Sequence, residues 1–90
     1  MEITVEKCGT RGIRTRERLH VSPQAGKTWL DMRIKGYTFD YERLSTGEYA
    51  CYMNTPDEDI KECMIFPPDT PIKRCFDDLI VACENRKVLS

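Results

Sequence analysis

The segment from residue 71 to about residue 86 spaces its apolar side chains as an amphipathic helix does, and this stripe constrains the fold most. The stripe falls at positions i, i+3, i+4, i+7, i+8 and i+11, which are Ile72, Cys75, Phe76, Leu79, Ile80 and Cys83. Thr70-Pro71 supplies a start signal, because a capping residue precedes a proline at the first helical position. A stripe of this kind has to be buried against another layer. We therefore expect a C-terminal helix at about 71–86 packed on one sheet face.

Most of the chain before this helix alternates polar and apolar residues with the period of β-strands. Ile3 and Val5 predict a first strand, and similar alternation runs through residues 13–21, 29–34, 37–44 and 49–53. The intervening turns are short, and short turns favour antiparallel pairing over parallel pairing. We expect an α+β fold with an antiparallel β-meander of about four to five strands. Ninety residues make one domain, residues 1–90.

Thr55-Pro56-Asp57-Glu58 has the order of a helix start, with a capping residue, a proline and a glutamate at the third helical position. The pattern predicts a short helix at about 56–64 that turns Ile60, Cys63 and Met64 toward the core. Phe66-Pro67-Pro68 would end it.

The charge is small overall but unevenly placed. The net charge of −1 provides no global field that would draw the chain to nucleic acid or to an anionic membrane. Residues 1–36 hold 8 basic and 4 acidic residues, a net of +4, and the remainder holds 6 basic and 11 acidic residues, a net of −5. These zones either neutralise each other across the fold or form separate charged surfaces.

The N-terminal residues and the cysteines predict a cytoplasmic protein. The start of the chain is charged and strand-like, so it is not a signal peptide, and no stretch approaches the roughly 18 apolar residues of a membrane helix. The five cysteines are an odd number without a secretory signal, which is typical of reduced thiols in a cytosol. We expect no membrane partner.

No pattern in the chain completes a catalytic, cofactor or metal site. Gly26-Lys27-Thr28 matches the end of a P-loop, but Val21 stands where its first glycine belongs. The cysteines form no C-x-x-C pair, and His20 is the only histidine. His20 is also the only candidate base for a thiol nucleophile. We therefore expect neither an enzyme nor a cofactor or metal.

Two groups of charged residues are candidate partner-binding sites. Alternation in the second strand places four potentially cationic side chains on one face: Arg14, Arg16, Arg18 and His20. Such a row needs solvent or an anionic partner to offset its mutual repulsion. The predicted short helix carries an acidic group that would suit a basic partner surface: Asp57, Glu58, Asp59 and Glu62. For both groups the alternative is an ordinary solvated surface.

These features together predict a binding module. We expect a small cytosolic protein–protein interaction domain, of the kind that phages and mobile elements encode as accessory inhibitors. That class includes anti-CRISPR and other anti-defence proteins, which act by binding a host protein complex. The alternative is a nucleic-acid-binding module that uses the basic strand with Lys27, Arg33 and Lys35. An open sheet edge would also allow a homodimer.

Overall fold

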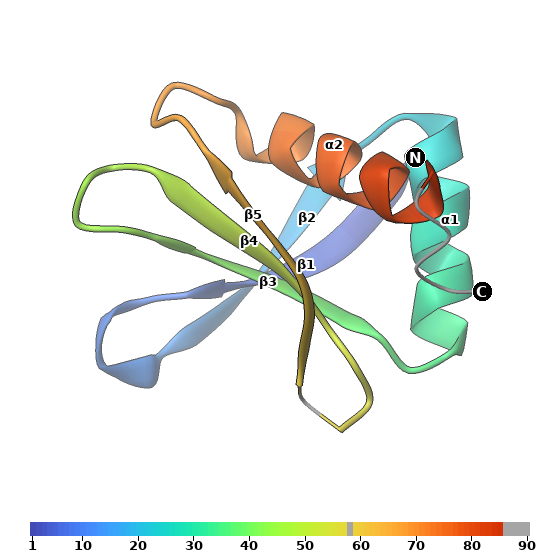
Figure 1. Cartoon of the computed structure of the whole chain (residues 1–90), viewed down its shortest axis with the longest axis horizontal. Helices are drawn as coiled ribbons and strands as arrows, with labels where there is room; N and C mark the ends of the chain where they lie inside the picture. The colour runs from blue at the N-terminus through green and yellow to red at the C-terminus, as the bar shows by residue number, and fades with distance from the viewer. Residues whose placement is uncertain (58, 86–90) are drawn as a thin grey trace.

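The computed structural model describes residues 1–57 and 59–85, and in them a five-stranded sheet packs with two α-helices (Figure 1). The predicted α+β class is confirmed. In chain order the elements are β1 (Glu2–Cys8), a short 3-10 turn η1 (Thr10–Gly12), β2 (Arg14–His20), α1 (Pro23–Ile34), β3 (Thr38–Arg43), β4 (Tyr49–Asn54), β5 (Ile60–Phe66) and α2 (Ile72–Asn85).

The sheet is mixed, so the prediction of a purely antiparallel meander is wrong. Its strand order is β2-β1-β3-β4-β5. The pairs β1–β2, β3–β4 and β4–β5 are antiparallel, whereas β1 and β3 are parallel. Parallel neighbours need a long connection between them. Here β2 and α1 together form that connection, and they return the chain to the free side of β1.

Residues 29–34 belong to α1, although their alternation predicts a strand. Ser22 caps this helix, because its Oγ accepts a hydrogen bond from the Ala25 N–H at 3.2 Å, and a proline follows the cap. Ala25 and Met32 are buried on one side of the helix, while Leu30 and Ile34 are 44% and 76% exposed on the other. Leu30 and Ile34, which contribute to the strand-like alternation, therefore lie on the solvent side of the helix.

The described residues of the range 56–64 do not form the predicted short helix; Pro56 and Asp57 lie in a turn, and residues 60–64 belong to β5. The Thr55 N–H donates to the Asp59 carbonyl at 2.8 Å, and the Asp59 N–H donates to Thr55 Oγ1 at 3.2 Å. The hydroxyl expected to cap a helix thus closes a β-hairpin. β5 then pairs along β4 and satisfies backbone groups that would otherwise face solvent at that edge.

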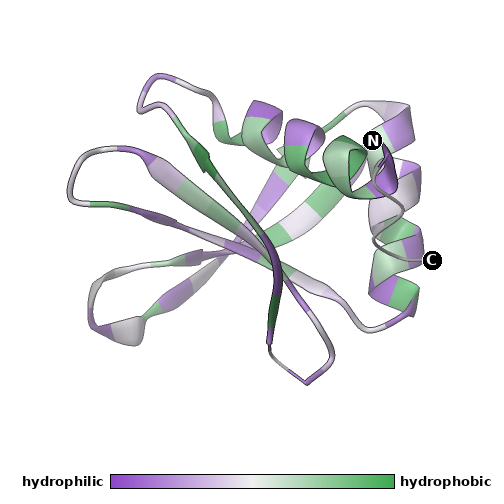
Figure 2. Cartoon of the chain, in the orientation of Figure 1, coloured by the Kyte–Doolittle hydropathy of each residue, from purple (hydrophilic) through white to green (hydrophobic). Residues whose placement is uncertain are grey.

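The predicted C-terminal helix is confirmed as α2, which runs to Asn85; the expected end at residue 86 lies outside the described residues. Five members of its apolar stripe are buried: Cys75, Phe76, Leu79, Ile80 and Cys83. The Phe76 ring lies edge-on to Phe39 and Tyr41, with centroid separations of 6.4 and 5.9 Å. In Figure 2 the ribbon of α2 alternates between hydrophobic and hydrophilic residues, as an amphipathic helix does.

The two faces of the sheet have different environments. The inner face, which α2 covers, buries Ile3, Val5, Phe39, Tyr41, Cys51 and Met53. α1 stands at one end of the sheet and packs against α2 (Figure 1). The opposite face, here called the outer face, carries the residues of other parity, and most of them are exposed or half-buried. The sheet therefore presents one broad face to solvent, which is polar except along β5, where Ile60 and Ile65 are exposed.

Candidate functional site

The predicted basic row is present on the outer face. Arg14, Arg16, Arg18 and His20 alternate along β2, and all four are exposed. Because β2 is an edge strand, the row runs along one margin of that face. The acidic group lies elsewhere.

Asp57 and Asp59 are exposed in the turn between β4 and β5. Glu62 is half-buried on β5, where it pairs with Met53 and so shares the inner face. Glu58 lies outside the described residues. β5 and β2 form opposite edges of the sheet, so the structure does not bring the predicted acidic and basic groups together.

Carboxylates on β1 and β3 lie beside the basic row. The strand register places Glu2 opposite His20, and Glu6 opposite Arg16. Arg14 Nη1 lies 3.2 Å from Glu6 Oε2 and 3.6 Å from Asp40 Oδ2. The hydrogen bond to Glu6 is the main reason that the pKa of Arg14 is raised. Within the described part of the chain, Arg16 and Arg18 make no such ion pair.

Asp40 joins four strands at the centre of the outer face. Its Oδ1 accepts from Asn54 Nδ2 at 2.9 Å, and its Oδ2 accepts from the Cys8 thiol at 3.5 Å and pairs with Arg14. Burial, and then the charge of Asp40, raises the pKa of Cys8. Cys8 is therefore a neutral hydrogen-bond donor near neutral pH, and this cluster organises the surface instead of supplying a nucleophile.

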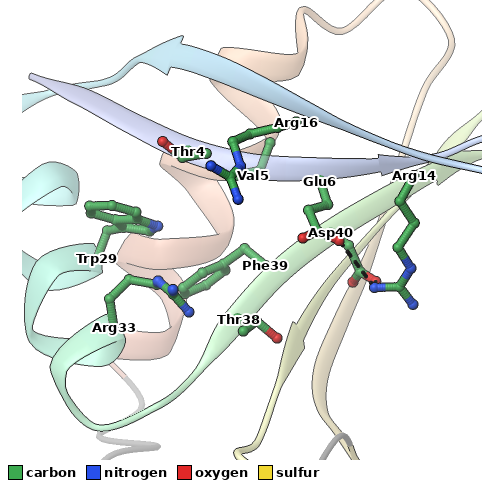
Figure 3. Close-up of a pocket in the computed structure, with 10 residues that line it drawn as sticks. All are labelled: Thr4, Val5, Glu6, Arg14, Arg16, Trp29, Arg33, Thr38, Phe39 and Asp40. Carbon is green, nitrogen blue, oxygen red and sulfur yellow. Dashed lines mark hydrogen bonds and ion pairs between the residues drawn. The ribbon is translucent and has the colours of Figure 1, made fainter.

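A groove of about 410 Å³ opens between the outer face and α1 (Figure 3). Arg16 enters it from β2 and Arg33 from α1, and we call it the Arg16–Arg33 groove. Figure 3 shows both guanidinium groups turned toward the space between Trp29 and Phe39, with the Arg14–Asp40 pair at the other end. Arg33 Nη1 donates to the Tyr37 carbonyl at 2.7 Å. The lining is completed by Thr4, Val5, Glu6 and Thr38.

No pattern in the sequence predicted that one site would contain Trp29, Arg33 and Asp40. Trp29 and Arg33 are four residues apart, so they share one side of a helix. That signal becomes visible only when residues 23–34 are assigned as a helix. The Asp40 carboxylate interrupts a run of aromatic residues on one strand, but its partners come from three other strands and have no local pattern.

The thiols and the helices show no further site. No disulfide joins any of the five cysteines within the described residues, and Cys51, Cys75 and Cys83 are buried. Burial raises the pKa of Cys51 and Cys75. Residues 1–57 and 59–85 contain no group of three His, Cys, Asp or Glu side chains placed to hold a metal. Neither of the helices in these ranges is long and apolar enough to cross a membrane.

Comparison with known proteins gives no relative from which a role could be transferred. No protein-family model matches the chain, and neither curated proteins nor solved structures include a match. A functional proposal therefore depends on the chemistry of the outer face.

Proposed function

We propose that this chain is a small protein-binding module of the accessory-inhibitor type, which docks its outer face on a host protein complex in the cytoplasm. One observation carries the proposal. The outer face is open and has both signs of charge, with the exposed Arg16 and Arg18 on β2 and the carboxylates of Glu2 on β1 and Glu42 on β3. Protein surfaces present complementary charges of both signs, and such complementarity gives specificity and register.

The same charge pattern favours protein over nucleic acid as the partner. A nucleic-acid backbone is uniformly negative, and its binding proteins present clustered cations along its path. On this outer face, the next two strands along the sheet from the basic row are β1 and then β3, which carry Glu2, Glu6, Asp40 and Glu42. These carboxylates would repel a phosphate backbone that extends beyond the row.

The accessory-inhibitor class suits a chain of this size, because covering a surface of a larger complex needs a rigid face and no catalytic set. Specific protein interfaces bury about 800 Å² on each partner. The chain exposes 5782 Å² in total, so an interface of that size would take roughly a seventh of its surface. Phage-encoded anti-CRISPR and other anti-defence proteins belong to this class.

Affinity capture from a bacterial host lysate tests the proposal, with an oligonucleotide gel shift beside it. We expect the tagged protein to retain one partner in stoichiometric amount, and to lose it when Arg16→Glu and Arg18→Glu are combined. We expect no shift of a random oligonucleotide at low salt. A shift that weakens steeply with salt and needs Arg16 and Arg18 would instead support the nucleic-acid alternative. Failure to retain any stoichiometric partner would contradict the protein-binding function.

A further inference from the structure

The Arg16–Arg33 groove holds two positive charges from different elements in one space. Arg16 comes from β2 and Arg33 from α1, and both guanidinium groups turn into the groove (Figure 3). Neither forms an ion pair within residues 1–57 and 59–85. Like charges in a shared groove repel, and an anion between them would convert that repulsion into two charge-assisted hydrogen-bonding interactions.

Glu6 and Asp40, the carboxylates that line the groove, do not serve this purpose, although Glu6 stands opposite Arg16 across β1 and β2. Glu6 and Asp40 are both engaged by Arg14, at 3.2 and 3.6 Å. Asp40 also accepts a hydrogen bond from Asn54. The carboxylates of the groove are thus paired with Arg14, whereas Arg16 and the donors of Arg33 other than the one that bonds the Tyr37 carbonyl are available.

The remaining lining of the groove suits a side chain with an apolar stem and an anionic tip. The hydroxyl groups of Thr4 and Thr38 line the groove and make no hydrogen bond to another described side chain or backbone group. The Trp29 ring forms a wall against which methylene groups would pack. The groove therefore offers charge, neutral hydroxyl donors and two aromatic rings, those of Trp29 and Phe39.

We propose that the Arg16–Arg33 groove binds a single glutamate side chain of the partner protein, with its carboxylate between Arg16 and Arg33 and its stem on Trp29. This inference rests on the proposed protein-binding function. A string of negative charges fits the site less well, because the carboxylates of Glu6 and Asp40 line the same groove. An isolated carboxylate on a protein surface avoids that repulsion.

Trp29 is the only tryptophan of the chain, so its fluorescence reports directly on the groove. The probes are a short peptide with one glutamate among glycines, and the same peptide with glutamine. We expect a saturable change with the glutamate peptide, and binding at least about ten-fold weaker with the glutamine peptide, because a charged hydrogen-bond partner is lost. A random oligonucleotide is titrated in parallel and should bind more weakly than the glutamate peptide.

Variants separate the groove from other exposed cations. Arg16→Gln and Arg33→Gln should each weaken glutamate-peptide binding about ten-fold. Lys27→Gln should not, because Lys27 is exposed on α1 but does not line the groove. Circular dichroism and the urea midpoint check that each variant folds, and Arg16→Gln carries the test if Arg33→Gln does not fold. Equal binding of both peptides, or undiminished binding by Arg16→Gln, would overturn the inference, as would tighter binding of the oligonucleotide.

The outcomes for the groove and for the proposed function are distinguishable. If the peptide titration fails while capture from lysate still depends on Arg16 and Arg18, only the glutamate inference is wrong. If the glutamate peptide binds as expected but the lysate yields no partner, the groove chemistry stands and the inhibitor function is wrong.

Discussion

Asp40 is the residue on which the order of the outer face most depends. Three side chains from three other strands reach its carboxylate: Cys8 from β1, Arg14 from β2 and Asn54 from β4. The residue is only 8% exposed, so these partners replace water that the carboxylate has lost. A buried polar network of this kind is stable when every member is satisfied, and removal of one member leaves the others unpaired.

We therefore predict that Asp40→Ala lowers the free energy of unfolding by about 1–3 kcal/mol, because Arg14 and Asn54 lose an acceptor. Asp69→Ala is the matched control, since Asp69 is exposed in the loop before α2 and should change stability by less than about 0.5 kcal/mol. Urea denaturation measures both. Equal effects at the two positions would contradict the role given to Asp40.

A second residue-scale prediction concerns alkaline pH. Burial, and then a hydrogen bond to Glu17 at 2.8 Å, raises the pKa of Tyr41 well above its ordinary value. Burial, and then a bond to Glu42, does the same for Tyr52. A phenol whose folded-state pKa is raised contributes stability that is fully present below its unfolded pKa of about 10, and that stability is lost as pH rises above it.

We accordingly expect the free energy of unfolding to fall above pH ~10, and to fall less steeply in Tyr41→Phe, which cannot ionise. Unfolding curves collected across the alkaline range give the slope of the free energy of unfolding against pH for the unchanged protein and for Tyr41→Phe. Parallel slopes for the two proteins would show that Tyr41 does not carry this pH dependence.

Among the elements, α2 was predictable from sequence, whereas α1 and β5 were not. Each of the three regions has a proline after a possible cap: Ser22-Pro23, Thr55-Pro56 and Thr70-Pro71. Two of these pairs precede helices and one begins a hairpin turn. A capping residue followed by a proline therefore does not distinguish a helix from a hairpin. The deciding factor is the length of the apolar pattern. Six apolar positions spaced over three helical turns predict α2 as a helix. The short apolar pattern after Thr55 fits both the helical period and the strand period.

The stability of α2 should follow from its buried stripe. Leu79→Ala leaves a cavity beneath the helix and should lower the free energy of unfolding by about 2–5 kcal/mol. Arg74→Ala, on the exposed side, should cost less than about 1 kcal/mol, since it removes only a solvent-exposed pair with Asp78. Denaturation with urea compares the two, and a small effect for Leu79→Ala would mean that the helix does not close the core.

On the scale of the whole molecule, the arrangement of two helices determines where a partner can dock. α2 covers the inner face and α1 stands at one end, so the outer face stays open (Figure 1). The basic row could be predicted, because it needs only the period of one strand. The Arg16–Arg33 groove could not, because it joins β2 to a helix whose alternation imitates a strand.

The central claim is that the outer face binds a protein, and capture from a host lysate with charge-reversed variants tests it most directly. The outer-face variant combines Arg16→Glu and Arg18→Glu. The control combines Lys27→Glu and Lys73→Glu, which make the same change of charge at exposed positions on α1 and α2. We predict that the control retains a stoichiometric partner that the outer-face variant has lost. Retention of that partner by the outer-face variant, with loss by the control, would contradict the account.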